Sequence, residues 1–383
     1  MSLPGFGVPV YVGRMPASPS PGTRKRKGSR PRDPALLSTT RAVEAFRLGL
    51  PVAIRGKDGN ALALAVETAP DGGVRALGTS PLLLLSHARA RTLKIRLYTP
   101  EVVALPVAPG TPEDSLRAIA DPTADLSAPL KGPFEAGREP LPQAFAASVK
   151  LAKLAGLLPA TVVRRIARIP PNLAQAEVDG IWNYELQSAR ALKMVARARV
   201  PLMDAENAEL VAFRAPDGGP EHYAIVIGAP PTDAPVLARL HSECFTGDLL
   251  GSLKCDCGDQ LRGAIAAIAR AGGGVLLYLA QEGRGIGLVN KLRAYRLQDQ
   301  GFDTHEANER LGFEADERLY PVAARMFALL GFKAVRLMTN NPSKVKGLKA
   351  AGIKVAERVP HAFPANPHNA RYLKSKEKAG HLF

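Results

Sequence analysis

All three cysteines of this 383-residue chain, Cys244, Cys255 and Cys257, lie within one short stretch. Three thiols this close together, in a chain without any other, are typical of one soft metal ion held by three thiolates, and Zn²⁺ is the usual occupant. A stretch that binds one ion must fold back on itself, and Gly247 and Gly251 make that bend cheap for the backbone. The sequence therefore predicts a metal site formed by this loop.

The number of ligands distinguishes two kinds of zinc site. A structural zinc ion normally has four protein ligands, whereas a catalytic zinc ion keeps one position for water. His241 lies close before Cys244 and can serve as the fourth ligand of a closed site. Without it, the open position holds a water molecule whose pKa falls to about 7, so that hydroxide is supplied at neutral pH. The spacing alone leaves both alternatives open.

Charge and composition narrow the class of protein. The formal net charge is +16, but six of these charges lie in residues 1–35, a Pro-, Ser- and Gly-rich segment that we expect to be a disordered basic tail. The remaining basic residues are dispersed, which suits a site for a polyanionic small molecule. No stretch reaches the roughly 18 apolar residues of a membrane helix, and the N-terminus lacks a secretory signal. We expect a cytoplasmic protein that binds neither membranes nor nucleic acid.

The pattern of predicted elements indicates two α/β domains. The first, residues 36–193, contains helix-like and strand-like runs, and its Pro- and Gly-rich segment 106–142 predicts a long loop or linker. Apolar residues at helical spacing predict a helix within 147–168. The second domain, residues 194–383, alternates regularly between strands and helices. We expect its strands at 209–213, 223–228, 275–280 and 334–338, with helices after the cysteine loop, after Gly287, from Pro321 and from Pro342.

Two polar loops of the second domain are candidates for binding phosphate. The loop Glu282-Gly-Arg-Gly-Ile-Gly287 follows a strand and precedes a helix, so its amides could cradle phosphate, or it could be a tight turn with a surface arginine. The triplet Asp316-Glu-Arg318 could join a proton acceptor to a phosphate-binding guanidinium, or simply cap a helix. Thr339 and Lys344 flank a further helix start, at Asn341-Pro, that suits an anion.

In their order along the chain, these motifs closely resemble GTP cyclohydrolase II, the enzyme that starts riboflavin biosynthesis. The resemblance runs through nearly all of residues 195–383 and implies an α/β catalytic domain with a mixed sheet. The motifs that carry it are His241-Ser-Glu-Cys244, Lys254-Cys-Asp-Cys-Gly258, Gln281-Glu-Gly-Arg-Gly-Ile-Gly-Leu288, Asn290-Lys-Leu-Arg-Ala-Tyr295, Asp316-Glu-Arg318 and Leu337-Met-Thr-Asn-Asn-Pro342.

The resemblance implies roles for individual residues. Cys244, Cys255 and Cys257 correspond to the ligands of one zinc ion per subunit, with water in the fourth position. Asp316 corresponds to the proton acceptor, and Arg318 to the residue proposed to attack the α-phosphorus and release pyrophosphate. The positions that correspond to substrate contacts are Arg239, Leu240, His241, Ser242, Glu243, Gln260, Glu282, Gly283, Arg284, Tyr295, Thr304, Thr339 and Lys344.

The resemblance also implies a reaction and its partners. GTP, with Mg²⁺ on its triphosphate, would be hydrolysed to 2,5-diamino-6-(5-phosphoribosylamino)pyrimidin-4-one, formate and pyrophosphate by a homodimer. Relatives with methionine at the position of Tyr295 tend to retain the formyl group, so this tyrosine implies complete loss of formate. Two alternatives remain: a cyclohydrolase-like enzyme of another nucleotide pathway, and a zinc module whose binding to nucleic acid is sensitive to salt.

Residues 36–193 faintly resemble a 3,4-dihydroxy-2-butanone 4-phosphate synthase, the domain that many family members carry before the cyclohydrolase. The likeness is clearest in Ala42–Val52, but the acidic metal-binding cluster expected next is replaced by Arg55-Gly-Lys-Asp-Gly-Asn60. The expected Gly-His-Thr-Glu type of motif is absent as well. We therefore expect a smaller, degenerate α/β domain that lacks synthase activity and has a structural, dimer-forming or regulatory role.

Overall fold

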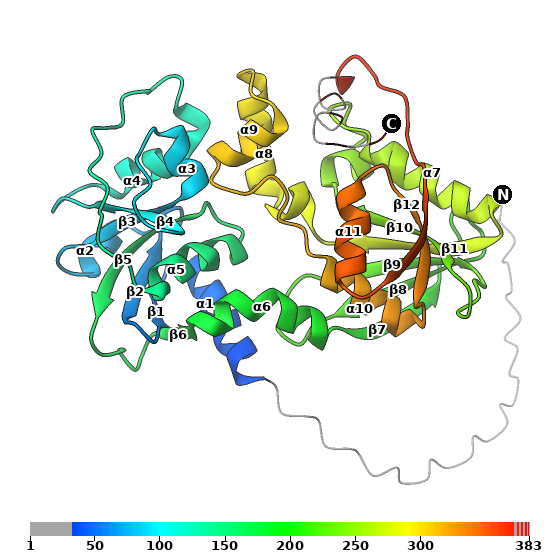
Figure 1. The fold of residues 1–383 in the computed structure, drawn as a ribbon, viewed down its shortest axis with the longest axis horizontal. Coiled ribbons are helices and arrows are strands. Elements are labelled where there is room, and N and C mark those ends of the chain that lie inside the picture. The colour runs from blue at the N-terminus through cyan, green and yellow to red at the C-terminus, as the bar shows by residue number, and fades with distance from the viewer. Residues whose placement is uncertain (1–32, 371–373, 375–376, 378–379, 381, 383) are drawn as a thin grey trace, which may run out of the picture. The chain divides into compact units, whose positions relative to one another are not determined.

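The computed structural model describes residues 33–370 together with 374, 377, 380 and 382. The basic tail predicted for residues 1–35 therefore lies outside the described residues, except for its last three positions. The described chain forms two mixed β-sheets with helices on both faces of each (Figure 1). This confirms the predicted α/β class. None of the described helices is both long and apolar enough to cross a membrane.

The first sheet has six strands in the order β4-β3-β5-β2-β1-β6. Only β1 and β6 pair in parallel, and every other neighbouring pair is antiparallel. Successive residues point to opposite faces, so that Ile54 belongs to one core cluster and Ala53 to the other. The strands are β1 Val52–Arg55, β2 Asn60–Ala65, β3 Leu82–Ser86, β4 Val102–Pro106, β5 Ala160–Ile166 and β6 Ala174–Glu177.

Two helices, α1 (Pro34–Arg47) and α5 (Gln143–Leu154), cover one face of this sheet. The synthase resemblance places an acidic cluster in the hairpin loop between β1 and β2. In this chain the loop contributes the carboxylate of Asp58. Its Oδ2 accepts a hydrogen bond from the amide of Gln143, 3.0 Å away, at the start of α5. The acid of this loop thus caps a helix.

The prediction of helical structure within 147–168 is right up to Leu154 and wrong beyond it. A left-handed backbone at Gly156 (φ 75°) follows the helix, and β5 begins at Ala160. The β-branched residues Thr161 and Val162 favour a strand over a helix, because their side chains are restricted against a preceding helical turn.

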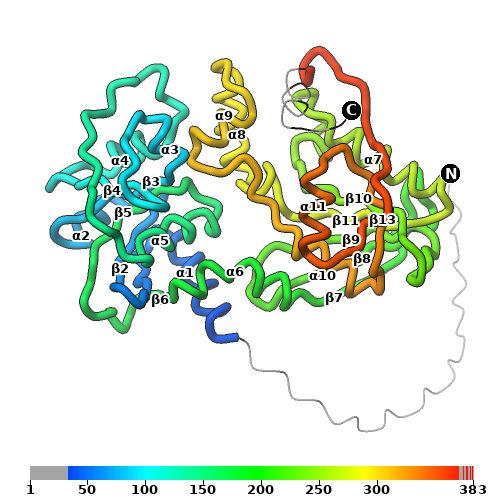
Figure 2. Tube along the Cα trace, in the orientation of Figure 1, coloured from blue at the N-terminus to red at the C-terminus, as the bar shows by residue number. Residues whose placement is uncertain are grey.

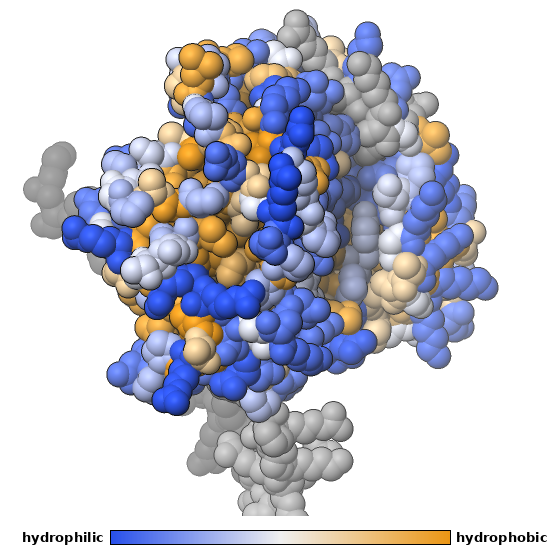
Figure 3. Space-filling model, turned by 60° about the vertical axis from the view of Figure 1, so that its left-hand side comes forward, coloured by the Kyte–Doolittle hydropathy of each residue, from blue (hydrophilic) through white to orange (hydrophobic). Residues whose placement is uncertain are grey.

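The opposite face of the first sheet is covered by α2 (Gly73–Ala76), α3 (His87–Thr92) and α4 (Glu113–Ala120). The predicted long loop at 106–142 is therefore wrong in part, because α4 and a 3₁₀ turn, η1 (Pro122–Ala124), lie within it. Leu116 and Ala120, four positions apart, are buried on one side of α4, while acidic residues occupy its first turn. On the face shown in Figure 3, hydrophobic side chains gather on the left-hand side and hydrophilic ones surround them.

The second sheet has seven strands in the order β13-β12-β10-β11-β9-β8-β7. Strands β10, β11, β12 and β13 are parallel, so their carboxyl ends meet at one edge, where α/β proteins bind ligands. The strands are β7 Lys193–Arg199, β8 Ala208–Arg214, β9 His222–Gly228, β10 Val236–Ser242, β11 Gly273–Leu279, β12 Ala334–Met338 and β13 Lys354–Val359.

Helices α10 (Tyr320–Leu330) and α11 (Pro342–Ala350) cover one face of the second sheet, and α7 (Cys257–Arg270) covers the other. The predicted N-cap of α11 is confirmed, because the side chain of Asn341 accepts a hydrogen bond from the amide of Ser343 at 2.8 Å. Helix α6 (Val178–Ala191) leads from β6 to β7.

Helices α8 (Leu288–Asp299) and α9 (Thr304–Arg310) follow β11 in the chain but pack against the first sheet's layer. Leu297 of α8 and Ala307 of α9 lie in the same buried cluster as Leu83 of β3. Figure 2 shows α9 beside α3, the helix that it contacts. One hydrophobic core is therefore built by residues from both halves of the chain.

Candidate functional site

A pocket opens at the carboxyl ends of the parallel strands of the second sheet. Most of the residues predicted from the sequence to bind substrate or metal line it. They are Arg239, His241, Ser242, Glu243, Cys244, Cys255, Cys257, Gln260, Glu282, Gly283, Arg284, Tyr295, Thr304, Arg318, Thr339 and Lys344. The fold thus brings together segments that are more than 100 positions apart in the sequence.

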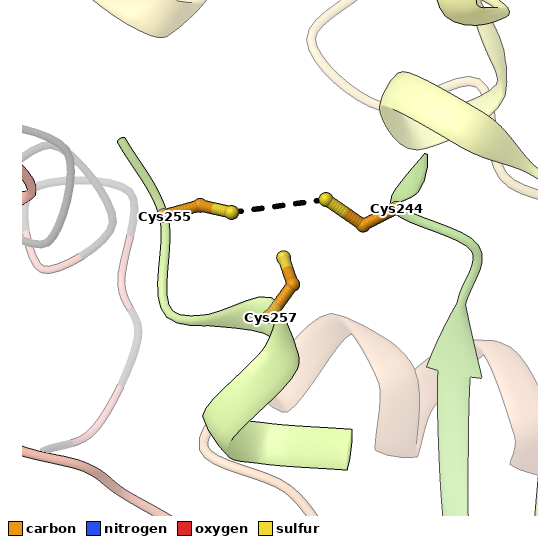
Figure 4. Close-up of side chains that lie close together, drawn as sticks. All are labelled: Cys244, Cys255 and Cys257. Carbon is orange, nitrogen blue, oxygen red and sulfur yellow. Dashed lines mark hydrogen bonds between the residues drawn. The ribbon is translucent and has the colours of Figure 1, made fainter. Parts of the chain in front are cut away.

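The three cysteines converge at one end of this pocket. Cys244 follows β10, Cys255 lies in the loop before α7, and Cys257 begins that helix, and their sulfur atoms point toward one another (Figure 4). The three sulfur atoms lie within 4.8 Å of one another, and those of Cys244 and Cys255 are 3.7 Å apart. No disulfide forms between them, so the described loop presents a cluster that could hold one metal ion.

The backbone at Gly247 makes room for this cluster. A Cβ atom at this position would lie 2.7 Å from the sulfur of Cys255 and 3.0 Å from the sulfur of Cys244. The sequence suggested conformational freedom as the reason for this glycine, but the structure gives close approach to the sulfurs as the stronger one. Three sulfur donors around a space kept clear of side chains fit a soft divalent ion such as Zn²⁺.

His241 lies beside the cysteine cluster but does not belong to it, because among the described residues neither of its ring nitrogens joins the ligand atoms that lie within 4.8 Å of one another. Its Nε2 lies 3.0 Å from both carboxylate oxygens of Asp248, and its ring stacks on Tyr278 with centroids 5.6 Å apart. Asp248 also accepts hydrogen bonds from the amide of Cys244 and the hydroxyl of Tyr278, each 3.0 Å long. Burial lowers the pKa of His241, against the hydrogen bond to Asp248. The Nε2 atom of His241 is thus hydrogen-bonded to Asp248, next to the cysteine cluster.

Lys291, which the sequence did not single out, connects the cysteine cluster to the glycine-rich loop. Its Nζ lies 2.8 Å from Oε1 of Glu282, 3.0 Å from the sulfur of Cys244 and 3.0 Å from Oγ1 of Thr246. Burial opposes the charge of Lys291, but hydrogen bonds to Glu282 and Cys244 outweigh burial and raise its pKa. An ammonium group in contact with a cysteine favours the thiolate form.

The glycine-rich loop forms a tight left-handed turn. Gly283 and Arg284 have φ of 62° and 64° within η3 (Glu282–Gly285), and α8 starts only at Leu288. Both carboxylate oxygens of Glu282 are hydrogen-bonded within the protein. Oε1 accepts from Lys291, and Oε2 accepts from the amide of Phe245 at 2.6 Å. The loop is therefore a tight turn whose arginine lines the pocket, and phosphate binding by its amides stays a prediction.

Buried cationic side chains form another wall. Arg239 is only 4% exposed, donates a hydrogen bond to the carbonyl of Met338 at 2.8 Å and bonds to Gln260. Burial lowers the pKa of Arg239 to about 10. Lys344 donates to the carbonyl of Leu240 at 2.7 Å. Leu240, which the sequence predicted to contact substrate, is 2% exposed and does not line the pocket, and its carbonyl is used by Lys344.

Asp316 and Arg318 form a paired unit at the edge of the pocket. The Nε of Arg318 donates to Oδ1 of Asp316 at 2.8 Å, and its Nη2 bonds to the other carboxylate oxygen. Burial raises the pKa of Asp316, but the hydrogen bond and charge of Arg318 outweigh it, so the pKa lies below the ordinary value. Leu319 is the N-cap residue of α10 and has no side-chain cap, so Asp316 does not play the alternative role of a helix cap.

Hydroxyl groups complete the lining. The hydroxyl of Tyr295 lies 3.3 Å from Oγ1 of Thr246, and its ring lies under the ammonium groups of Lys254 (5.1 Å) and Lys291 (5.5 Å). Thr304 accepts from Gln298 at 3.3 Å, whereas Oγ1 of Thr339 accepts from the amide of Asn341 at 3.0 Å. Lining residues that the sequence did not identify are Lys254, Ile286, Lys291, Ala294, Gln298, Asn308, Asn340, Asn341 and His361.

Comparisons with known proteins identify relatives of the chain. The family model for GTP cyclohydrolase II matches residues 193–360. A GTP cyclohydrolase-2 of Azospirillum brasilense is 51% identical over 364 residues, which cover 91% of this chain and 94% of the relative. The match therefore includes both halves of the chain.

Two further matches are a riboflavin biosynthesis protein and a solved structure. The riboflavin biosynthesis protein RibBA of Synechocystis sp. is 47% identical over 253 residues, which cover 61% of this chain and 45% of that protein. Among solved structures, RibBX, a two-domain 3,4-dihydroxy-2-butanone 4-phosphate synthase from A. baumannii, is 16% identical with a TM-score of 0.33, covering 85% of this chain and 99% of the other.

Proposed function

Because the chain belongs to the GTP cyclohydrolase II family of riboflavin biosynthesis, we propose that its pocket hydrolyses GTP to 2,5-diamino-6-(5-phosphoribosylamino)pyrimidin-4-one, formate and pyrophosphate. The observation that carries this proposal is the convergence of three cysteine sulfurs with a strongly cationic wall in one pocket. Sulfur ligands suit a soft metal ion that activates water, and clustered cations suit a triphosphate.

Cys244, Cys255 and Cys257 are the residues that would hold a zinc ion. The donor set fits, since three sulfur atoms lie within 4.8 Å of one another around the space that Gly247 leaves clear. When bound, the ion supplies a water molecule of lowered pKa for hydrolysis of the purine ring. The protein's own contribution is to keep the donors together, and Lys291 favours the thiolate form of Cys244 through its hydrogen bond.

The charge of the pocket suits the triphosphate. Six Lys and Arg side chains line it against two glutamates, Glu243 and Glu282, and Glu282 is already paired with Lys291. Phosphoryl transfer depends mainly on charge compensation and alignment, which such a wall provides before substrate arrives. We assign a Mg²⁺ ion to the triphosphate itself. The six cations are Arg239, Lys254, Arg284, Lys291, Arg318 and Lys344.

We assign the release of pyrophosphate to Asp316 and Arg318. Arg318 lines the pocket, whereas Asp316 does not line it and accepts two hydrogen bonds from the side chain of Arg318. A guanidinium that attacks the α-phosphorus must give up a proton, and the carboxylate of Asp316 is the adjacent acceptor. The lowered pKa of Asp316 keeps it ionised and ready for that role.

Tyr295 is assigned to the purine end of the site, where it favours complete loss of formate. The centre of its ring lies 5.1 Å from the ammonium group of Lys254 and 5.5 Å from that of Lys291, and its hydroxyl bonds to Thr246 beside the cysteine cluster. We also propose that the protein is a homodimer and that residues 36–193 form a domain without synthase activity.

The proposal is tested by incubating the purified protein with GTP, Zn²⁺ and Mg²⁺ and measuring formate and pyrophosphate. We expect both products in equal amounts, and neither with ATP, which lacks the guanine base. A protein that contains zinc and binds GTP but releases no formate would refute the proposed reaction. Formate without pyrophosphate would refute the assignment of Asp316 and Arg318.

A further inference from the structure

The first half of the chain contacts the loop that carries Asp316 and Arg318. Lys153, in the last turn of α5, places its Nζ 2.5 Å from Oε1 of Glu317, the residue between the two proposed catalytic groups. Both side chains are largely buried, with 17% and 19% of their surface exposed. An ion pair this well covered is screened far less than a surface pair, so it can hold a loop in place.

Glu317 is fixed from more than one direction. Its carboxylate also accepts a hydrogen bond from the amide of Glu314 at 3.0 Å, and its own amide donates to the carbonyl of Arg284 at 3.0 Å. A Cβ atom at Gly285 would lie 2.7 Å from the carbonyl oxygen of Glu317. The loop of Asp316 and Arg318 is thus packed directly on the glycine-rich turn of the pocket.

Lys153 also contacts the beginning of this loop. Its Nζ lies 5.6 Å from the ring centroid of Phe313, a residue with 1% exposure in the core shared by both halves of the chain. Burial raises the pKa of Glu317, but the charge of Lys153 outweighs it and lowers the pKa, so the pair is ionic. One ammonium group therefore contacts the loop at Phe313 and at Glu317.

We propose that Lys153 is a positioning residue for the cyclohydrolase reaction, acting through Glu317 to hold Asp316 and Arg318 against the pocket. This inference rests on the roles proposed above for those two residues. Lys153 does not line the pocket, and the first half of the chain contributes to the reaction through this contact without binding the substrate. A displacement of about 1 Å at a reacting group can reduce the rate roughly 100-fold.

The test compares Lys153→Met with Lys150→Met in the full-length chain. Lys150 lies in the same helix and pairs with Glu185 at 2.7 Å, with similar exposure (16% and 27%). Its charge also lowers the pKa of Glu317, but less than the charge of Lys153 does, and its ion pair is with Glu185 and not with Glu317. For Lys153→Met we expect kcat for pyrophosphate release to fall roughly tenfold or more, with KM for GTP within about threefold of the wild-type value. Lys150→Met should retain kcat within about twofold, although both variants lower the Tm by similar amounts.

Two further variants distinguish positioning from simple loss of stability. Lys153→Arg keeps a cation at this position and should restore at least half of the kcat. Glu317→Gln should lower kcat as Lys153→Met does, and the double variant should be no worse than either single one, because both remove the same contact. Equal kcat for Lys153→Met and Lys150→Met, or additive losses in the double variant, would overturn the inference.

The experiments distinguish failure of the proposed function from failure of the role proposed for Lys153. If Arg318→Ala retains full activity, the roles of Asp316 and Arg318 are wrong, and the reason for positioning this loop disappears with them. If Arg318→Ala is inactive while Lys153→Met is fully active, the proposed function stands and only the role of Lys153 is refuted. Thermal melts of every variant confirm that the comparison is made on folded protein.

Discussion

The Nε2 atom of His241 lies 3.0 Å from each carboxylate oxygen of Asp248. This contact bears on the question that the sequence left open, whether the histidine completes a closed metal site. Asp248 occupies Nε2, and among the described residues neither ring nitrogen of His241 joins the three cysteine sulfurs in the group of ligand atoms that lie within 4.8 Å of one another. The geometry therefore favours three protein ligands and a position for water. The first two predictions follow from this arrangement.

Replacement of Cys255 by serine should remove the metal. A serine hydroxyl is a far weaker ligand for a soft ion than a thiolate, so bound zinc should fall from about one ion per chain to well below half. Formate release should fall by more than about 100-fold. Metal content measured by elemental analysis gives a readout independent of turnover. Ser252→Ala, in the same loop, is the control and should retain zinc. Normal formate release by a metal-free Cys255→Ser protein would exclude the zinc mechanism.

Replacement of Gly247 by alanine should weaken metal binding although no ligand is changed. The new Cβ would lie 2.7 Å from the sulfur of Cys255, so either the loop or the sulfur must move. We expect at least a tenfold loss of zinc affinity, measured by competition with a chelator. Gly251→Ala is the matched control, since no atom lies within 4 Å of its Cβ and only its left-handed backbone opposes the change. Equal affinities of the two variants would show that Gly247 has no part in forming the site.

Replacement of Arg318 by alanine should affect turnover more than GTP binding. We expect kcat to fall roughly 100- to 1000-fold, the usual loss for a group that acts on the transition state, while KM changes less than about fivefold. Arg318→Lys keeps the charge but not the planar contact to Asp316, and should recover only part of the activity. Arg336→Ala, which removes an exposed ion pair with Glu357, should behave like the wild type. A change confined to KM would assign Arg318 to binding alone.

Acid should destabilise the protein through His222. Burial lowers the pKa of this side chain to about 4, against the charge of Asp217, whereas its ordinary value is about 6.5. Between these two values the unfolded chain binds a proton at His222 and the folded protein does not. Stability therefore falls as the pH drops from about 6.5 to about 4, by about 2 kcal/mol between pH 7 and pH 5 for this group.

Urea denaturation at those two pH values tests this prediction. His222→Asn keeps an acceptor for the amide of Ala280, which bonds to Nδ1 of His222 at 3.1 Å. The variant should therefore show a smaller difference in the free energy of unfolding between the two pH values. His368→Asn, at an exposed position, should leave the difference unchanged. An undiminished difference in His222→Asn would show that other groups cause the acid sensitivity.

The parts of the site that could be predicted from the sequence depend on short segments. The cysteine cluster was visible because its ligands lie within one loop, and the start of α11 because Asn341 and Pro342 form a local cap signal. Strand β10 was not predicted, although it carries four candidate residues, Arg239, Leu240, His241 and Ser242. Its buried positions include Arg239 and His241, which face the pocket, so the strand lacks the apolar pattern that indicates a buried strand.

Contacts between distant segments could not be predicted. Lys291 reaches Cys244 across 47 positions, and His361 reaches the carbonyl of Gln260 across 101 positions at 2.9 Å. The ion pair of Lys153 and Glu317 spans 164 positions and depends on how α8 and α9 pack against the first sheet. Such contacts are set by tertiary packing, and neither residue type nor local spacing reveals them.

Leu83, Leu297 and Phe313 share one buried core, so the two halves of the chain cannot simply be expressed apart. A cut at the junction between the two sheets would not separate two self-sufficient modules, because it would strip α8 and α9 of the apolar partners that now shield them from water. A shortened version of this chain would need hydrophilic replacements on those helices before it stayed in solution. The half that we expect to have lost its own chemistry thus still covers the apolar side chains of α8 and α9.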